Sequence, residues 1–406
     1  MGIALLVFVV TYLLISFQNI PGVHIRRPAA ALLGAVAMVV FGVLRMDESY
    51  RMVDYDTLVF ILGMMIVIGY LEITGFFEQV ENVILRYART TRQLLALLIA
   101  SSGVLSALFM NDTICLMLTP VVLRIVKRAR LSPNAYLIAL ATSSNIGSVM
   151  TPMGNPQNMI VAIHSGIPFL DFVGYLWPVA SVGLVMNYWV IRWVYPAEFG
   201  VSRTIEVVSE RSPVRTRLLY VCLAAVALLL LLFALNLPPP IVALSVASLL
   251  ILAGARRPQE AFKHIDWELL LMFAGLFVVM GGLRRSGALE SLFGLVNDSL
   301  VRSTAYQVGW ISGLSTVLSN IVSNVPCVVF FVNLIPQAGD HHSLWLALAM
   351  ASTLAGNLTL IGSVANLIVF ETAKKDARVG FWEYFKAGAP LTVFLIVAGT
   401  LYLMMI

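Results

Sequence analysis

The sequence reads TPMGNPQN at residues 151–158 and TLIGSVAN at residues 359–366, and each stretch interrupts a long apolar run. These runs extend over residues 135–165 and 343–370. Proline removes a backbone donor and glycine loosens a helix, so both runs are predicted to form broken helices. The two stretches carry the same residue types, Thr, Gly and Asn, at their first, fourth and eighth positions. This match indicates that the chain contains two related halves.

The relation between the halves extends well beyond these stretches. A constant offset of 212 residues aligns proline, acidic and glycine positions of the second half with the same residue types in the first, and small gaps carry the register further. The pairs include Pro240 with Pro28, Asp266 with Asp54, Gly281 with Gly69, and, at an offset of 213, Asn324 with Asn111. Self-similarity of this length indicates a duplicated structural unit.

The composition excludes a water-soluble globule. Hydrophobic residues make up 60% of the chain and charged residues 12%, with a mean hydropathy of +0.91, whereas soluble proteins average about 45–50% apolar and about 25% charged residues. Since a membrane-spanning helix needs about 20 residues, the chain has room for about ten spans joined by short loops. No sizeable domain outside the membrane fits.

Short apolar runs pair up within residues 93–127 and 304–336, and each pair is predicted to form a re-entrant helical hairpin. Residues 76–91 alternate apolar and charged side chains at helical spacing, which favours a helix in the membrane interface. The predicted fold is an all-α polytopic membrane protein of two inverted-topology repeats, each with five transmembrane helices, one hairpin and a broken helix at the midplane. The repeats cover residues 1–200 and 217–406, joined by a cytoplasmic linker at 201–216.

The distribution of basic residues predicts the orientation in the plasma (inner) membrane. With both termini outside, only Arg45, Arg51, Arg284, Arg285 and Arg302 of the 26 lysines and arginines lie outside. Basic residues concentrate on the cytoplasmic side of membrane proteins, so this orientation is strongly favoured. The hairpin at 93–127 then enters from the cytoplasm and the hairpin at 304–336 from the exterior.

The hairpin tips and helix breaks are rich in polar residues. Unpaired backbone groups are costly in hydrocarbon, so such segments persist where protein or an aqueous cavity satisfies them. In transporters, half-helix ends of this kind bind substrates and coupling ions near the midplane. The predicted binding residues are Asn111, Asp112, Thr113, Ser144, Asn145, Gly154, Asn155, Asn158, Ser323, Asn324, Asn357, Thr359, Gly362, Ser363 and Asn366.

Asp112 is the strongest single candidate for carrying the coupling ion. An acidic side chain at membrane depth costs at least about 2.5–3.5 kcal/mol on insertion scales, so a functional role is the default interpretation. Its counterpart in the second half is Val325, which makes the site asymmetric. The alternative is that Asp112 only caps the returning half-helix. Helix capping is the predicted role of Asp54 and Asp266, whereas His164 is expected to be solvated.

No lysine or arginine falls within the tips or breaks, and this absence bears on the substrate. Helix ends, amides and hydroxyls would have to hold an anion there. Such groups suit a neutral or weakly charged oxyacid better than a multiply charged carboxylate.

Three motifs carry a resemblance to a known group: Asn111-Asp112-Thr113 with Leu118-Thr119-Pro120, the stretch at 151–158, and residues 357–366. They resemble the ion transporter superfamily, which includes arsenite/antimonite efflux permeases, D-type Na⁺/H⁺ antiporters, melanosomal P proteins, and citrate and divalent-anion/Na⁺ symporters. Dicarboxylate symporters of that group carry Ser-Asn-Thr at each tip. Here only the asparagines match, and the Asn-Asp pair is similar to the arsenite-permease and antiporter branch. The resemblance implies that Gly154 and Asn155 at the first break, and Gly362 and Ser363 at the second, belong to the binding site.

These observations predict a secondary transporter, not an enzyme, that exports a small oxyanion or metalloid of the arsenite type in exchange for H⁺. The alternatives are a Na⁺- or H⁺-coupled dicarboxylate, citrate or sulfate symporter, and a Na⁺/H⁺ antiporter. A channel and an intramembrane hydrolase are disfavoured. The expected partners are the lipid bilayer, the substrate, the coupling ion and a second copy of the chain; ATP drive would need a separate ATPase subunit. No cofactor or nucleic acid is predicted. If Na⁺ binds, its expected ligands are Asn111, Asp112 and Gly154, and Asn324 and Gly362.

Overall fold

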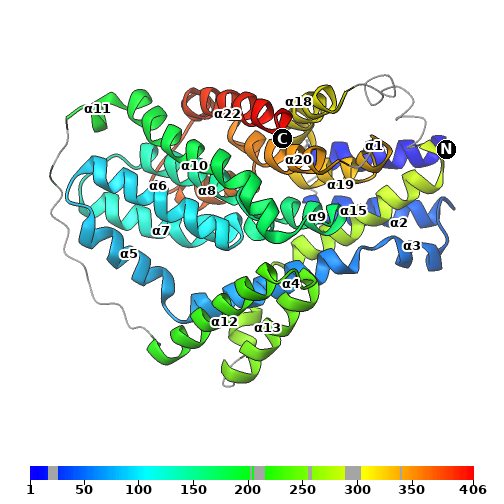
Figure 1. The fold of residues 1–406 in the computed structure, drawn as a ribbon, viewed down its shortest axis with the longest axis horizontal. Coiled ribbons are helices and arrows are strands. Elements are labelled where there is room, and N and C mark those ends of the chain that lie inside the picture. Colours follow the sequence, from blue (N-terminus) through cyan, green and yellow to red (C-terminus); the bar gives the residue numbers. More distant parts are fainter. Residues whose placement is uncertain (17–25, 202–203, 205–214, 255–257, 289–302, 339–340) are drawn as a thin grey trace.

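A computed structural model describes residues 1–16, 26–201, 204, 215–254, 258–288, 303–338 and 341–406. Within these residues the regular structure is helical, and Thr90 and Thr204 form an isolated β-bridge. The elements of the first half are α1 (Gly2–Ser16), α2 (Arg27–Val40), α3 (Met46–Met52), α4 (Tyr55–Ile73), α5 (Phe76–Tyr87), α6 (Thr91–Leu108), α7 (Asn111–Arg128), α8 (Pro133–Ser148), η1 (Pro152–Gly154), α9 (Pro156–Ser165), α10 (Phe169–Val194) and α11 (Pro196–Phe199) (Figure 1).

The second half follows a similar order of elements. They are α12 (Thr216–Ala234), α13 (Pro239–Gly254), α14 (Pro258–Phe262), α15 (Trp267–Arg285), α18 (Thr304–Val322), α19 (Asn324–Val332), η2 (Ile335–Ala338), α20 (His342–Leu354), η3 (Ala355–Asn357), α21 (Val364–Ala373) and α22 (Phe381–Met404). Among the described residues, six helices are long and apolar enough to cross a membrane: α4, α6, α10, α12, α15 and α22.

Both long apolar runs are split as the sequence predicted. The first forms α8 and α9 with η1 between them, and the second forms α20 and α21 with η3 and an irregular stretch between them. The short runs give α6 and α7, joined by Phe109 and Met110, and α18 and α19, joined by Ser323 alone. Ser323 has a φ of 78°, a left-handed conformation that is uncommon for a residue with a side chain.

The first predicted interfacial helix is α5, whose residues Phe77, Ile84 and Leu85 are buried while Val83 and Tyr87 are exposed. Its expected counterpart in the second half lies outside the described residues. The two predicted N-caps are confirmed. The Asp54 side chain accepts a hydrogen bond from the Thr57 backbone N–H at 3.2 Å, and Asp266 accepts one from Leu269 at 2.9 Å.

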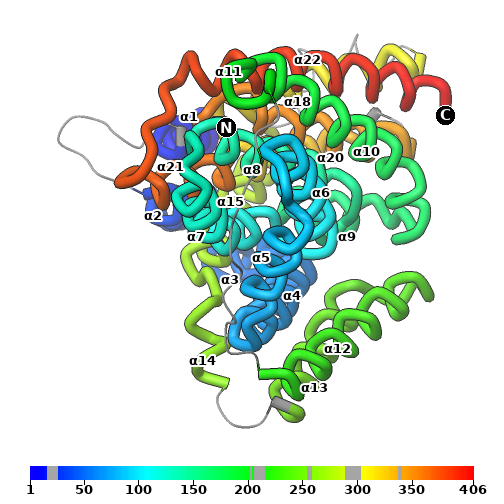
Figure 2. The backbone as a smooth tube through the Cα atoms, turned by 90° about the vertical axis from the view of Figure 1, so that its left-hand side faces the viewer, coloured from blue at the N-terminus to red at the C-terminus, as the bar shows by residue number. Residues whose placement is uncertain are grey.

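Helices of the two halves cross at two glycine contacts. α2 packs against α15, and α4 packs against α13, with α12 beside α13 and α4 (Figures 1 and 2). A Cβ atom on Gly63 of α4 would lie 2.7 Å from the backbone of Ala243, and one on Gly275 of α15 would lie 2.7 Å from that of Ala31. Both pairs of residues are related by the 212-residue offset, so each half repeats the same close crossing.

Substitution of either crossing glycine by alanine should destabilise the protein. The added Cβ would press on backbone atoms that cannot move aside, and overpacking of this kind costs about 1–3 kcal/mol. Thermal unfolding of the purified protein in detergent measures the loss. The control is Gly174→Ala in α10, where a Cβ atom meets nothing within 4 Å; replacing this helix-interior glycine should stabilise by about 0.5–1 kcal/mol. Equal effects at all three positions would contradict the crossing role.

Candidate functional site

The two breaks and the two hairpins meet in one buried region. The first hairpin packs against both broken helices, through α6 and α7 on α8 and α7 on α21. The second does the same, through α18 and α19 on α20 and α19 on α9. Each hairpin therefore contacts the broken helix of its own half and that of the other half. The predicted site residues are supplied by the ends of these helices.

Asn145, near the C-terminal end of α8, is the centre of a buried amide network. Its side-chain oxygen accepts hydrogen bonds from the Asn111 amide at 2.9 Å and the Ser363 hydroxyl at 3.1 Å. Its amide nitrogen donates to the side-chain oxygens of Asn357 at 2.9 Å and Asn366 at 3.0 Å. All five residues are buried. One side chain thus joins the first hairpin tip to the break of the second half.

A second network occupies the related position in the other broken helix. Thr353 lies 208 residues after Asn145, the same offset that relates the two breaks. Its hydroxyl accepts a hydrogen bond from the Asn155 amide at 3.2 Å and donates to the Asn158 side-chain oxygen at 3.3 Å. Asn155 also caps α9, because its side-chain oxygen accepts from the Asn158 backbone N–H at 2.8 Å. The contacts between halves are therefore reciprocal.

One asparagine in each half satisfies the carbonyls that its helix break exposes. The side-chain amide of Asn158 donates to three carbonyls at the end of α8 and in the break that follows, those of Ser148 at 3.0 Å, Val149 at 3.4 Å and Thr151 at 3.1 Å. The side-chain amide of Asn366 donates to two carbonyls within the second break, those of Gly356 at 2.7 Å and Thr359 at 3.1 Å. Buried backbone groups need such partners, so these asparagines stabilise the irregular backbone.

The hairpin tips are held by the same region. The Ser144 hydroxyl donates to the Asn111 carbonyl at 3.2 Å. A Cβ atom on Gly356 would lie 3.3 Å from the Asn324 amide nitrogen and 3.5 Å from that of Asn145, so the second tip also approaches Asn145. Neither break glycine has room for a side chain, because Gly154 faces the Ser148 backbone and Gly362 faces the Asn320 side chain. Thr113 lies half-buried in the first turn of α7.

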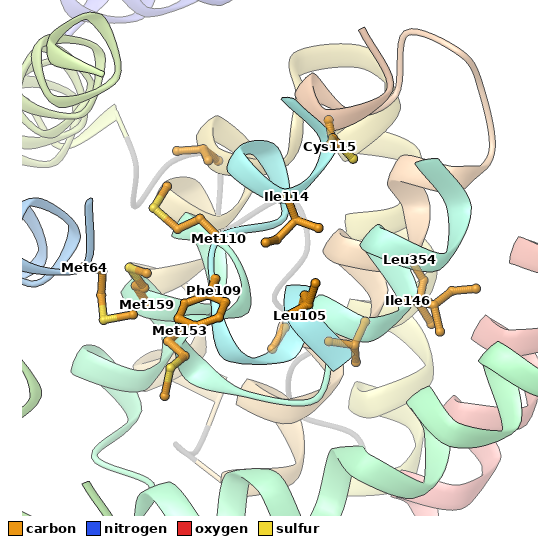
Figure 3. Close-up of a cluster of buried hydrophobic side chains, with 14 of the residues drawn as sticks. Met64, Leu105, Phe109, Met110, Ile114, Cys115, Ile146, Met153, Met159 and Leu354 are labelled. Atoms are coloured by element: carbon orange, nitrogen blue, oxygen red, sulfur yellow. The ribbon is translucent and has the colours of Figure 1, made fainter. Parts of the chain in front are cut away.

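An apolar wall borders the first tip. Figure 3 shows Met64 of α4, Met153 of η1 and Met159 of α9 near Phe109 and Met110, the two residues that join α6 to α7. All five side chains are buried. Methionine side chains are flexible and adapt to irregular gaps, which suits a surface that packs against a turn.

Sequence reasoning missed Arg27, the first residue of α2. Its Nη1 donates to the Ser323 hydroxyl at the second hairpin tip, at 3.4 Å. Arg27 thus places a positive charge beside the second tip, although no lysine or arginine lies within the tips or breaks themselves. A comparison of the two halves could have pointed to Arg27. The 212-residue offset relates it to Pro239, so only the first half carries a charged residue at this position.

Two histidine–carboxylate pairs lie at opposite ends of α4. His164 Nε2 lies 3.6 Å from Asp54 Oδ2, so the prediction that His164 is merely solvated is wrong. At the other end, His264 Nδ1 lies 2.6 Å from Glu72 Oε2, and burial together with Lys263 lowers the pKa of His264. The His164 pair borders a cavity of about 510 Å³ that Arg284 and Asn333 also line. Sequence spacing alone could not bring these residues together.

Comparisons with known proteins cover nearly the whole chain. A family model described as citrate transporter matches residues 12–355. An uncharacterised transporter of Mycobacterium bovis is 31% identical, over 99% of this chain and 97% of its own. The silicon efflux transporter LSI3 of rice (Oryza sativa subsp. japonica) is 29% identical, over 97% and 95%. The crystal structure of the Alcanivorax borkumensis YdaH transporter aligns with a TM-score of 0.54 at 13% identity, covering 100% of this chain and 96% of that one, which shows a similar fold.

Proposed function

The chain belongs to the citrate transporter family, whose members are membrane transporters and not enzymes, and we propose that it exports a small oxyacid or metalloid in exchange for protons. The observation that carries this proposal is the buried polar region formed by two hairpin tips and two helix breaks, with Asp112 at its edge. An ionisable side chain at membrane depth is a functional residue by default. Protonation and substrate binding at one place allow the two to be exchanged across the membrane.

The architecture that we propose is a pair of inverted repeats, residues 1–200 and 217–406, joined by residues 201–216. The reciprocal contacts support it: Asn145 with Ser363 and Asn366, and Thr353 with Asn155 and Asn158, are related by the offset of 208. In this arrangement both termini lie outside, the hairpin of α6 and α7 enters from the cytoplasm, and that of α18 and α19 enters from the exterior. The polar region then lies at the membrane midplane.

A neutral oxyacid of the arsenous or silicic type is the substrate class that we propose. Most of the polar region consists of amides and hydroxyls, which donate and accept hydrogen bonds but carry no charge. The rice relative named for silicon efflux supports this class, because silicon in neutral water is present mainly as an uncharged hydroxy acid. Asp112 is the proposed proton carrier, and the amides around Asn145 and Asn324 are the proposed substrate contacts.

One observation favours a second candidate function. The Arg27 guanidinium beside the second tip is a suitable partner for a carboxylate or another anion, because a guanidinium offers charged, planar donors. This arrangement favours a proton- or sodium-coupled anion symporter, which the family description also supports. The two functions differ in a simple measurement, since a symporter takes up its anion together with the coupling ion.

A thermal-shift screen of the purified protein tests the substrate class. A ligand that binds only the folded state increases the free energy of unfolding by mass action, by about 2.7 kcal/mol at a hundredfold excess over its Kd. The unfolding temperature rises as a result. The ligands are arsenite, antimonite, silicic acid, succinate, citrate, sulfate and Na⁺. We expect stabilisation by the neutral oxyacids. Stabilisation by a carboxylate or by sulfate alone, strengthened by Na⁺ or acid, would support the symporter and contradict the proposed export.

A further inference from the structure

His164 has one ring nitrogen whose proton is fixed and one that faces a carboxylate. Its Nδ1 lies 2.9 Å from the Ile160 carbonyl oxygen, which can only accept a hydrogen bond, so Nδ1 carries a proton. Its Nε2 lies 3.6 Å from Oδ2 of Asp54. In the neutral ring Nε2 therefore has the lone pair, and protonation converts it to a donor. The nitrogen that gains and loses a proton is the one that faces Asp54.

Asp54 is held as an acceptor on both of its carboxylate oxygens. Oδ1 accepts a hydrogen bond from the Thr57 backbone N–H at 3.2 Å, and Oδ2 accepts one from the Thr57 hydroxyl. An ionised carboxylate only accepts hydrogen bonds, so a neutral Nε2 would turn its lone pair towards a second acceptor. A proton on Nε2 replaces this repulsion by an ion pair. The geometry therefore has a place for one proton between the two side chains.

The pair joins two helices that have different places in the fold. His164 lies in the last turn of α9, and the first turn of the same helix supplies Asn158 to the buried network at the first break. Asp54 caps α4, which packs against α9 and crosses α13 of the other half at Gly63. A proton on His164 would thus tie the half-helix that follows the break to a helix that contacts the other half.

The pair is accessible to protons from solvent. His164 and Asp54 both line the cavity of about 510 Å³, and their side chains remain 31% and 19% exposed. Partial exposure allows exchange with water in the cavity. A partly buried pair of charges is also screened less by salt than a pair on the open surface. The site can therefore bind a proton reversibly and gain stability when it does so.

Asp54 is the carboxylate that acts on the His164 ring. It forms the one ion pair of His164 within the part of the chain that the structure describes. The other acids of α4 lie elsewhere. Asp56 is exposed and lines a different cavity, and Glu72 lies against His264 at the opposite end of the helix.

The other helices around the pair add one positive charge. Arg284 of α15 lines the same cavity and opposes a proton on His164, but its side chain is exposed, so water screens its effect. α19 adds the uncharged Asn333 to this cavity, and the Cys327 thiol of that helix donates to a carbonyl of α18 instead. His342, the first residue of α20, lines a separate cavity, and η1 has no titratable residue. The ion pair with the aspartate is the contact that a proton strengthens.

The duplication repeats the aspartate but not the histidine. Asp266 caps α15 in the way that Asp54 caps α4. The offset of 208 relates His164 to Thr372, so the second half has no histidine at this position. The cap at Asp266 forms without such a partner, and capping therefore does not require one. The histidine is an addition to the first half alone.

We propose that Nε2 of His164 is a proton-binding site separate from Asp112, and that a proton bound there ties α9 to α4 through Asp54. The proton comes from water in the cavity and adds to the Nε2 lone pair, and the imidazolium then pairs with the carboxylate. Histidine ordinarily changes charge between about pH 5 and 8, so the tie forms at acidic pH and is lost as the pH rises. The inference goes beyond the proposed function, because it depends on neither the substrate nor the coupling ion.

A double-mutant cycle at two pH values tests the site on the purified full-length protein. The variants are His164→Asn, Asp54→Asn and both together; asparagine at position 54 keeps an N-cap while removing the charge. Thermal unfolding in detergent is measured at about pH 5 and about pH 8.5, on either side of the histidine range. At the acidic pH each single substitution should lower the unfolding temperature by about 1–2 °C, and the double variant should lose no more than either one. At the alkaline pH this coupling should vanish or change sign.

The matched control pairs His164→Asn with Asp56→Asn. Asp56 lies in the first turn of the same helix and forms no ion pair with any described residue, so its effect should add to that of His164→Asn at both pH values. If His164→Asn yields no folded protein, His164→Gln replaces it in the same cycle. Additive effects of the Asp54 and His164 substitutions at acidic pH, or a coupling that is equal at both pH values, would overturn the inference. The cycle uses no substrate, so its result stands even if the chain moves none of the proposed oxyacids.

Discussion

An Asp112→Asn variant should lose the response of substrate efflux to an imposed pH gradient. Asparagine has nearly the same shape but cannot bind and release a proton, so a cycle that depends on carboxylate protonation stops. We expect the gradient-driven flux to fall to the level of protein-free vesicles, while the folded protein remains at normal yield. The measurement is efflux of arsenite or silicic acid from vesicles at several external pH values. This measurement tests whether Asp112 is the group that binds and releases the coupling proton.

The matched control is another acid of the same chain, Asp171 in the first turn of α10, which is exposed. Asp171→Asn removes a carboxylate without touching the tips or breaks, and its flux should equal that of the wild type. An Asp112→Asn variant whose flux still follows the pH gradient would contradict the role of Asp112. The coupling proton would then have to bind elsewhere, and the His164–Asp54 pair beside the cavity would be the next residue pair to test.

Asn145→Ala should cause one of the largest losses of stability in the chain. The change removes four side-chain hydrogen bonds, to Asn111, Ser363, Asn357 and Asn366. Such bonds average about 0.6 kcal/mol in a membrane protein, with a maximum near about 1.7, and each stranded buried polar group costs about 1–3 kcal/mol. We expect a loss of about 3–5 kcal/mol, which only a few mechanisms produce. Thermal unfolding in detergent and the yield of monodisperse protein measure it.

Two further variants provide comparisons for the effect of Asn145→Ala on stability. Asn134→Ala removes bonds near the surface, to the Arg378 carbonyl and Glu383, and should cost about 0.5 kcal/mol or less. Thr353→Val, at the related position, removes the hydroxyl that joins Asn155 to Asn158 and should fall between the two. If Asn145→Ala were as mild as Asn134→Ala, the amide network would not be what holds the halves together at this point.

Local signals were sufficient to predict the broken helices and the helix caps. Proline and glycine occur close together at residues 151–158, and glycine lies at 362. Because both residues weaken a helix, the positions of the breaks could be predicted without tertiary structure. Asp54 and Asp266 precede apolar helices and cap them by a local bond. The repeat offset added long-range information, because it predicted that the tips and breaks of the two halves occur in matching order.

The partners of these residues could not be predicted from local signals. The bonds from Asn145 to Asn357 and Asn366 join positions more than 200 residues apart in the chain, and nothing in the spacing selects them over other pairs. Arg27 was missed because it lies outside the tips and breaks, and its hydrogen bond to Ser323 joins positions 296 residues apart in the chain. His164 was missed for the same reason, since its carboxylate partner lies on another helix.

Proton-driven flux through the purified chain alone, reconstituted in liposomes without ATP, tests the central claim most directly. The protein is a secondary transporter in this account, so an imposed pH gradient should drive arsenite or silicic acid against its concentration gradient. A protonophore should abolish that accumulation, and Asp112→Asn vesicles should show none. Flux that is unaffected by the protonophore, or that equals the flux of protein-free liposomes for these oxyacids, would contradict proton-coupled export.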